Sequence, residues 1–254
     1  MPTNEKILGV IPARWASSRF PGKPLADING KPMVQWVSEQ VQKASLITEV
    51  IVATDDKRIY DVVFEFGGKA VMTSSKHQSG TDRVAEVAKN IECDIVVNVQ
   101  GDEPLIPSEN IDLVIKPLLN SEDLPVTTLM TDIRSRSEML DPNICKVVVD
   151  NNGRALYFTR APIPYNREQF KSLNDQQPEQ VDGYMRHIGI YAYRADFIKR
   201  YVAWNESPLE RIESLEQLRV LWHGEKIHVA EAIMPPAAGI DTPEDLEQAR
   251  QRIK

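Results

Sequence analysis

Cysteine is scarce in this chain, with only Cys93 and Cys145 among its 254 residues, each inside an apolar segment. Proteins held together by disulfides carry more cysteines and fold in oxidising compartments. We therefore expect two buried free thiols that act as small apolar side chains, and no disulfide framework.

Long apolar runs are also absent from the sequence. No segment approaches the about 18 consecutive apolar residues of a membrane-spanning helix. Residues Met1 to Lys6 lead directly into a short apolar strand, without the charged start and apolar centre of a signal peptide. The sequence therefore predicts no membrane insertion and a cytoplasmic location.

An excess of basic residues is the third absence. The chain has 30 Lys and Arg against 37 Asp and Glu, a formal net charge of −7. Non-specific binding to nucleic acid needs a basic surface, so no nucleic-acid partner is expected. An acidic protein still binds small anions where its cations gather locally, so local clusters matter more than the total.

Short apolar segments alternate with amphipathic ones in the first half of the chain. The segments 7–11 and 50–53 have the length and composition of buried strands, 69–72 is a short strand, and 94–99 is a third major strand. Helices are predicted between them, including one from Pro32 to about Ala44 and one that begins near Ser79. This alternation predicts βαβ units and an α/β fold with a mostly parallel central sheet.

The second half of the chain is richer in strand-like segments, at 126–133, 144–149, 155–159 and 187–193. The polar residues 166–183 are predicted to form a long loop. Ser207-Pro208-Leu209-Glu210 is a capping box that predicts a helix running to about Trp222. A similar pattern, from Thr242 to Asp245, predicts the last helix.

Ligands of such sheets bind beside the carboxyl ends of the strands. The loop Pro12–Leu25 follows the first strand and places Arg14, Arg19 and Lys23 within ten residues. A loop with three cations and a flexible glycine is suited to binding a polyphosphate. The alternative is a basic loop that is merely exposed to solvent, and the position at the end of a strand favours the binding loop. The loop is not a P-loop, and the chain lacks the G-x-G-x-x-G pattern of Rossmann dehydrogenases.

Two further loops carry polar groups suited to a nucleotide. Gln100-Gly101-Asp102 follows the strand 94–99, where a carboxylate can hold Mg²⁺ against triphosphate oxygens and an amide can bind a base or ribose. The alternative is a simple turn with a capping aspartate. The segment Gln78–Arg83 begins a helix, whose N-terminus favours anions, although Ser79 also suits an ordinary helix cap.

Together these segments resemble the 3-deoxy-manno-octulosonate cytidylyltransferase (CMP-KDO synthetase) family. The resemblance spans nearly the whole chain and rests on seven segments in the same order, namely 12–25, 78–83, 99–104, 155–161, 186–191, 207–226 and 239–245. It implies a Rossmann-like nucleotidyltransferase fold with a smaller β-rich elaboration for sugar binding and dimerisation. It further implies a homodimer that uses CTP and Mg²⁺, transfers CMP to a sugar acid of the KDO type and releases pyrophosphate for lipopolysaccharide biosynthesis.

The resemblance also assigns roles to residues. We expect one domain, 1–254, in which 1–125 mainly binds CTP and 126–254 mainly binds the sugar and forms the dimer. The residues expected to grip the triphosphate and assist catalysis are Arg14, Arg19 and Lys23. Those expected to bind the nucleotide are Ser18, Ser79, Gly80, Arg83 and Gln100. Those expected to bind the sugar acid are Arg160, His187, Tyr191, Glu213, Glu216 and Gln217. Asp102 and Asp241 match the family's metal-binding aspartates.

Three positions depart from the family pattern. Trp15 stands where a tyrosine is usual, and Tyr165-Asn166 replaces the usual Trp-Asp. The lost carboxylate leaves open whether the sugar is KDO or its 8-amino-3,8-dideoxy form, with a sialic acid as a more distant alternative. A non-catalytic nucleotide-binding protein is the alternative of another class, but it predicts the loss of Lys23, Asp102 or Asp241, and all three are present.

Overall fold

The structure is a computed structural model and describes residues 5–16, 20–167, 179–235, 237 and 239–253. Its strands are β1 (Ile7–Ala13), β2 (Asp27–Ile28), β3 (Lys31–Pro32), β4 (Glu49–Thr54), β5 (Ala70–Met72), β6 (Ile95–Asn98), β7 (Val126–Ser135), β8 (Lys146–Val149), β9 (Ala155–Thr159), β10 (Gln180–Arg194) and β11 (Ile227–Glu231). Its helices are the 3₁₀ turn η1 (Lys23–Leu25), α1 (Met33–Lys43), α2 (Lys57–Glu65), α3 (Gly80–Asn90), α4 (Ser108–Asn120), α5 (Arg136–Leu140), α6 (Ala195–Tyr201), α7 (Pro208–Glu213), α8 (Leu218–Trp222) and α9 (Pro243–Arg252).

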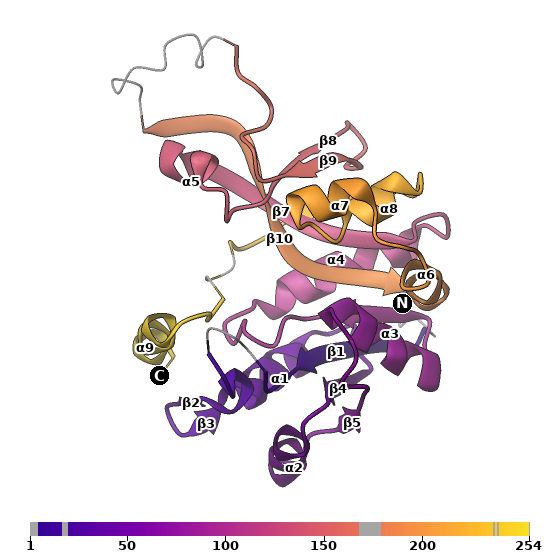
Figure 1. The fold of residues 1–254 in the computed structure, drawn as a ribbon, viewed down its shortest axis with the longest axis vertical. Coiled ribbons are helices and arrows are strands. Elements are labelled where there is room, and N and C mark those ends of the chain that lie inside the picture. Colours follow the sequence, from indigo (N-terminus) through magenta and orange to yellow (C-terminus); the bar gives the residue numbers. More distant parts are fainter. Residues whose placement is uncertain (1–4, 17–19, 168–178, 236, 238, 254) are drawn as a thin grey trace.

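One large sheet organises the described part of the chain, in the order β11-β7-β10-β6-β1-β4-β5 (Figure 1). Strand β1 is parallel to both β4 and β6, and β4 is parallel to β5. On the other side of β10, β11 is parallel to β7, while β8 and β9 extend the sheet from β10. The predicted α/β fold with its mostly parallel central sheet is confirmed.

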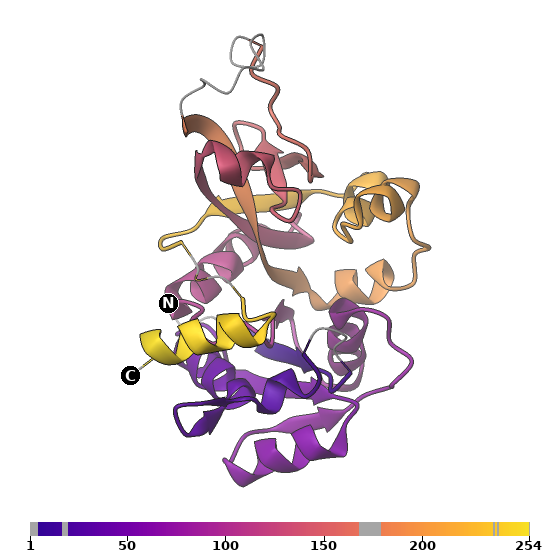
Figure 2. The same ribbon diagram turned by 60° about the vertical axis from the view of Figure 1, so that its left-hand side comes forward.

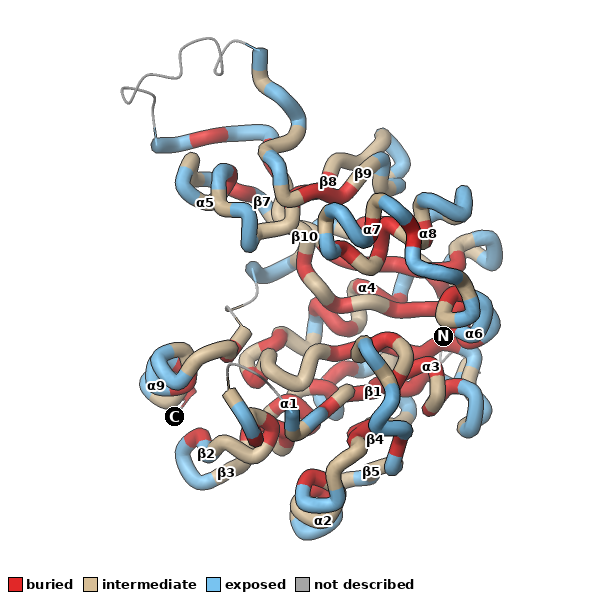
Figure 3. Tube along the Cα trace, viewed as in Figure 1, coloured by how far each residue is buried: buried red, intermediate tan, exposed pale blue. Residues whose placement is uncertain are grey.

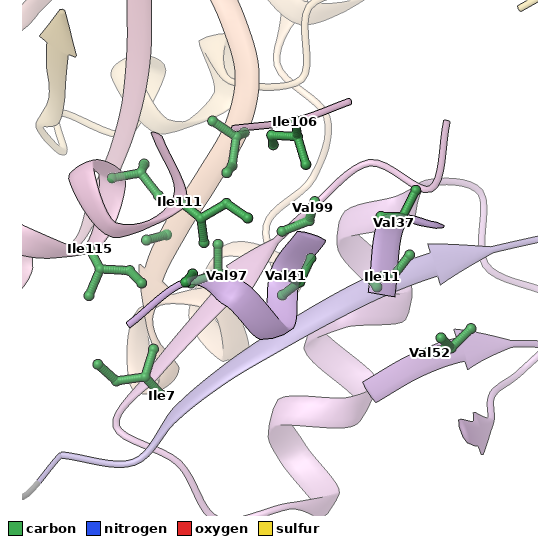
Figure 4. Close-up of a cluster of buried hydrophobic side chains, with 14 of the residues drawn as sticks. Ile7, Ile11, Val37, Val41, Val52, Val97, Val99, Ile106, Ile111 and Ile115 are labelled. Atoms are coloured by element: carbon green, nitrogen blue, oxygen red, sulfur yellow. The ribbon is translucent and has the colours of Figure 1, made fainter. Parts of the chain in front are cut away.

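Alternating side chains of β1 explain why helices cover both faces of the sheet. Ile7 and Ile11 belong to a core cluster with side chains of α1 and α4, which Figure 4 shows from close by. Leu8 and Val10 point to the other face and belong to a cluster with side chains of α3 and α6. A central strand with both faces buried is apolar throughout, as the sequence of this segment predicted.

The long strand β10 joins the two halves of the molecule. It is antiparallel to β7 along most of its length, and its last residues pair with β6 (Figures 1 and 2). The predicted loop 166–183 is therefore wrong at Gln180–Gly183, which belong to this strand. Residues 168–178 of that segment lie outside the described part of the chain. Pairing with β7 supplies the hydrogen bonds that local polarity could not reveal.

The predicted helix 207–222 is divided in two. The capping box is confirmed, because Ser207 and Glu210 satisfy each other's backbone N–H groups at the start of α7. The helix ends at Ser214, whose φ of 52° is left-handed, and α8 begins only at Leu218. The intervening residues carry Glu216 and Gln217, so this break places polar side chains that a continuous helix would direct elsewhere.

The chain returns to its N-terminal half at the end. Helix α9 lies beside β2 (Figure 2), and its Arg250 donates hydrogen bonds to the Asp27 carbonyl at 2.9 and 3.1 Å. Leu246 and Ile253 pack with Ile28 in a small apolar cluster. Figure 3 shows the buried interior along the central strands and the exposed outer sides of α2 and α9. No helix in the described ranges has the length and apolar character needed to cross a bilayer.

Candidate active site

Two neighbouring cavities lie against the central sheet. The first, of about 300 Å³, is lined by the loop after β1, the start of α3, the loop after β6, and Asp241. The second, of about 200 Å³, is lined by β10 and the segment 215–217. Gln100 lines both, and its side-chain amide donates a hydrogen bond to the Gly189 carbonyl at 3.3 Å. The site therefore consists of two cavities that adjoin at Gln100.

The loop after β1 is closed by contacts around Trp15. The Gly22 N–H donates to the Trp15 carbonyl at 3.0 Å, and the indole covers Gly22 so closely that an added Cβ would lie 2.9 Å from the ring. Gly22 has a φ of 73°, which also favours glycine. The Arg58 guanidinium also stacks on the Trp15 ring, with Cζ of Arg58 at 3.4 Å from the ring centroid, and it forms an ion pair with Asp56. These contacts fix the position of η1, which begins at Lys23.

The structure brings three predicted residues of this site together. Lys23 Nζ lies 2.6 Å from Asp102 Oδ2 and 3.1 Å from Asp241 Oδ1. Asp241 reaches this point because the Ile240 N–H donates to the Asp102 carbonyl at 2.9 Å. Gly101 allows the close turn, since a Cβ there would lie 2.8 Å from the Pro12 carbonyl oxygen. Arg14 also lines this cavity, whereas Ser18 and Arg19 lie outside the described residues.

The carboxylates of Asp102 and Asp241 both contact the Lys23 ammonium, so they lie close enough together to bind one divalent cation. Mg²⁺ keeps several waters and is commonly held by one or two protein carboxylates together with substrate phosphates. Asp102 and Asp241 meet that need, and both line the first cavity. In the described part of the chain no group of three metal-ligating His, Cys, Asp or Glu side chains occurs. The donor set therefore suits a metal that is completed by a phosphate ligand rather than a closed structural metal site.

The N-terminus of α3 forms another wall of the first cavity. Ser79 caps the helix through a capping box with Asp82, and Gly80 is its first residue. The buried Arg83 side chain pairs with Asp55 at 3.0 Å and donates to the Thr73 hydroxyl, so its guanidinium is held at the cavity rather than in solvent. Ser79, Gly80 and Arg83 all line the first cavity, as predicted for nucleotide-binding residues.

The second cavity collects four of the six residues predicted for the sugar acid, namely His187, Tyr191, Glu216 and Gln217. Glu216 accepts hydrogen bonds from the Ser79 and Thr81 hydroxyls, each at 3.2 Å, and so connects this cavity with α3. Burial raises the pKa of the Glu216 carboxyl and raises that of the Tyr191 phenol well above its ordinary range. The walls therefore offer groups that are buried and, at Glu216, already hydrogen-bonded to hydroxyl groups of α3 and its cap.

Arg160 and Glu213 line neither of these cavities. Arg160 donates to the backbone carbonyls of Glu213, Pro142 and Ser214, and the Glu213 carboxylate accepts from the Thr159 hydroxyl at 2.6 Å. Together they attach the end of α7 to β9. Their position next to Ser214 means that they orient the segment carrying Glu216 and Gln217.

Sequence reasoning missed several lining residues. His77, to which the sequence assigned no role, lines the first cavity, and its ring contacts the Glu86 carboxylate. Asn98 lines the second cavity, and its buried Oδ1 has no hydrogen-bond partner among the described residues. A signal for Asn98 was present, because an amide inside an otherwise apolar strand needs a partner.

His187 should make stability depend on pH. Burial, with Arg186 nearby, lowers its pKa from 6.5 to about 3. Between these values the unfolded chain binds a proton that the folded protein does not, so this stabilisation is present above pH 6.5 and is lost as pH falls. At pH 5 we expect about 2 kcal/mol less stabilisation from this residue than at pH 7.5.

Urea unfolding of the original protein and of His187→Gln at both pH values measures this effect. We expect the difference in free energy of unfolding between the two proteins to shrink by about that amount at pH 5. The same change at the exposed His223 controls for the loss of a histidine as such. An equal difference at the two pH values would show that the folded His187 titrates normally.

Comparisons with known proteins identify relatives of this chain. Residues 8–227 match the family model described as Cytidylyltransferase. A 3-deoxy-manno-octulosonate cytidylyltransferase of Idiomarina loihiensis is 57% identical over 246 residues, which are 95% of this chain and 96% of the relative. The protein of the same name from Vibrio parahaemolyticus is 58% identical over 244 residues, 95% of each chain.

Solved structures extend the comparison. A CMP:2-keto-3-deoxy-manno-octonic acid synthetase complexed with CTP is 45% identical, with a TM-score of 0.90 over 98% of both chains. A 4-diphosphocytidyl-2C-methyl-D-erythritol synthase from Anaerococcus prevotii is only 15% identical, with a TM-score of 0.62, and shares the fold alone.

Proposed function

This chain belongs to the cytidylyltransferase family, and on that premise we propose that it transfers CMP from CTP to 3-deoxy-manno-octulosonate and releases pyrophosphate. The observation that carries the proposal is the pair of cavities that meet at Gln100. One has cations and carboxylates suited to a triphosphate, and the other has hydroxyl, amide and imidazole groups suited to a sugar acid. A transfer between two bound substrates needs such adjoining chambers.

The first cavity is the proposed CTP site. Arg14 and Lys23, with Arg19 of the same loop, neutralise the triphosphate and the pyrophosphate as it leaves. The N-terminus of α3, with Ser79 and Gly80, and the guanidinium of Arg83 bind the nucleoside and its phosphates. Gln100 contacts the nucleotide from the boundary with the second cavity.

The second cavity is the proposed sugar site. His187, Tyr191, Glu216 and Gln217 line it and offer hydrogen bonds to the sugar hydroxyls. Arg160 and Glu213 act through their attachment of α7 to β9, which orients Glu216 and Gln217. The sugar carboxylate then lies toward the cations of the first cavity.

Asp102 and Asp241 are the proposed ligands of Mg²⁺, because both carboxylates lie within 3.1 Å of the Lys23 ammonium and can serve one cation together. When bound, the ion neutralises phosphate charge and lowers the pKa of a coordinated hydroxyl. Lys23 then remains available for the phosphate oxygens of the leaving group.

The proposed reaction is an in-line displacement at the α-phosphorus. A bond forms between the anomeric oxygen of the sugar and the α-phosphorus, and the hydroxyl proton is lost to solvent. The bond between the α-phosphorus and the oxygen that bridges it to the β-phosphate breaks, so that pyrophosphate leaves. Most catalysis in such transfers comes from positioning and charge stabilisation. Lys23 and Arg14 stabilise the departing charge, while Gln100 and the residues of the second cavity hold the two substrates in line.

The proposed organisation is a single domain, 1–254, that acts as a homodimer in the cytoplasm. Its residues 1–125 mainly bind CTP, and 126–254 mainly bind the sugar and form the dimer. Large apolar side chains are exposed on the second half, with Leu156 on β9 at 62%, Ile212 on α7 at 80% and Trp222 on α8 at 54%. Contact with a second copy in the proposed dimer would remove these side chains from water.

The experiment incubates the purified protein with CTP, Mg²⁺ and a sugar acid, and measures pyrophosphate release. We expect the highest kcat/KM with 3-deoxy-manno-octulosonate. A higher kcat/KM with the 8-amino-3,8-dideoxy form would retain the reaction and correct the substrate, and the same holds for a sialic acid. Pyrophosphate release with none of the three sugars would refute the proposed function.

A further inference from the structure

The Thr128 hydroxyl lies at the centre of a hydrogen-bond network beneath His187. Its Oγ1 lies 2.7 Å from the Ile190 carbonyl oxygen, 3.0 Å from the Ile188 carbonyl oxygen and 2.9 Å from His187 Nε2. Thr128 is fully buried on β7, opposite the irregular part of β10 that contains both carbonyl groups. Water cannot replace a missing partner at such a position, so each of these contacts must be compatible with the others.

The count of protons fixes the direction of each bond. A threonine hydroxyl has one proton, and a carbonyl oxygen only accepts. If Thr128 donated its proton to His187 Nε2, its lone pairs would face two carbonyl oxygens at 2.7 and 3.0 Å without a hydrogen between them. The favourable arrangement is the reverse: Thr128 donates to the carbonyl groups, and His187 Nε2–H donates to Thr128.

The Thr128 hydroxyl then shares its one proton between the two carbonyl oxygens and accepts a hydrogen bond from His187 Nε2–H. The network is therefore consistent only with a proton on Nε2 of His187.

The other ring nitrogen is consequently left with a lone pair. Burial keeps the imidazole neutral, with a pKa of about 3, so Nδ1 carries no proton when Nε2 does. Nδ1 makes no hydrogen bond with any described residue, and His187 lines the second cavity. The ring is held from the side by the edge contact with Phe158, at 5.1 Å between centroids. A fixed hydrogen-bond acceptor is thus available to a ligand.

We infer that Thr128 is a positioning residue that holds His187 as the Nε2–H tautomer, so that Nδ1 accepts a hydrogen bond from a hydroxyl group of the sugar acid. The inference rests on the proposed function, because it assigns the second cavity to the sugar. It makes His187 selective: a hydroxyl of the sugar can donate to Nδ1, whereas a bare carbonyl or carboxylate oxygen would be repelled.

The tautomer can be observed in the free protein. Long-range ¹H–¹⁵N NMR spectra distinguish the protonated from the unprotonated nitrogen of a histidine ring. The chain has four histidines, so loss of one signal set in His187→Gln assigns its resonances. We expect a single Nε2–H tautomer between pH 6 and 8. A proton on Nδ1, or a mixture of tautomers, would overturn the inference without any measurement of activity.

Two substitutions then test the role of Thr128. Thr128→Ser keeps the hydroxyl and should keep both the tautomer and the KM for the sugar. Thr128→Val removes it, and we expect a mixture of tautomers and an about fivefold higher KM for the sugar, since one hydrogen bond is worth about 1 kcal/mol, with the KM for CTP changed less than twofold. A raised sugar KM with an unchanged tautomer would mean that Thr128 acts through packing alone.

The proposed function and this inference fail in different ways. If no sugar acid releases pyrophosphate, the proposed function fails, and the NMR spectra of the free protein still decide whether Thr128 fixes the tautomer. If the sugar is turned over but His187 carries its proton on Nδ1, the proposed function stands and the inference fails.

Discussion

Replacing Lys23 by alanine is expected to lower kcat about 10²–10³-fold, the usual loss when one group that stabilises transition-state charge is removed. Lys23 Nζ lies within 3.1 Å of both Asp102 and Asp241 and lines the proposed CTP site. Its loss removes the cation that would neutralise the departing pyrophosphate. Pyrophosphate release at saturating CTP and sugar measures the effect, and circular dichroism checks that the variant is folded.

Asp102→Asn should cause a comparable loss of kcat by a different route. It keeps the size of the side chain but removes one of the two charges proposed to hold Mg²⁺. We therefore expect the Mg²⁺ concentration for half-maximal activity to rise in Asp102→Asn and not in Lys23→Ala. An activity above one tenth of the original in either variant would remove that residue from the proposed mechanism.

Lys31→Ala is the matched control for these two variants. Lys31 has the same side chain and an ion pair with Glu39 at 2.8 Å, but it lines neither cavity. Its replacement should leave kcat within about twofold, because an exposed ion pair contributes little even to stability. A large loss in this control would point to a general effect of charge rather than to the position of Lys23.

Replacing Arg219 by methionine is expected to lower the free energy of unfolding by about 3–5 kcal/mol. Arg219 binds the Glu210 carboxylate through two nitrogens, at 2.5 and 2.9 Å, and both side chains are largely buried, at 14% and 7% exposure. Glu210 also caps α7. Removal of the guanidinium leaves a buried carboxylate without its partner, which is costlier than the loss of an exposed pair.

Arg200→Met is the control for this prediction. Arg200 pairs with Glu225 at 3.4 Å, but its side chain is 59% exposed. Its loss should cost less than about 1 kcal/mol. Urea unfolding of both variants measures the two changes, and similar values for Arg200→Met and Arg219→Met would contradict the importance of burial for the Arg219–Glu210 pair.

The sequence predicted the first half of the fold well because local patterns dominate there. The strand at Ile7–Ile11 and the helix after Pro32 appear within a few residues of their predicted ends, since an apolar segment or a capping residue acts on its own neighbours. The second half was predicted less well. Its strand β10 begins at Gln180 in a polar segment, and a strand with an exposed face lacks the continuous apolar pattern from which a buried strand is predicted.

The candidate site divides in the same way. Placing the Lys23 loop and Asp102 at one edge of the sheet required only the ends of two parallel strands, because parallel strands direct their carboxyl ends to the same side. Contacts between distant segments of the chain lie beyond such reasoning. Arg160 was predicted to bind the sugar acid, and only the structure shows that its guanidinium donates to three backbone carbonyl groups of the chain itself.

By itself, the sequence determined the α/β class, the βαβ units of the first half, the capped starts of α3, α7 and α9, and the family. These depend on residues close in the chain or on motifs that keep their order. Only the tertiary structure decided that Asp241 lies 3.1 Å from Lys23, 218 residues away, and that the break at Ser214 brings Glu216 to Ser79. It also decided which groups surround the Thr128 hydroxyl, namely two carbonyl oxygens and the His187 imidazole. These groups meet there because of the register between β7 and β10, which no local sequence pattern specifies.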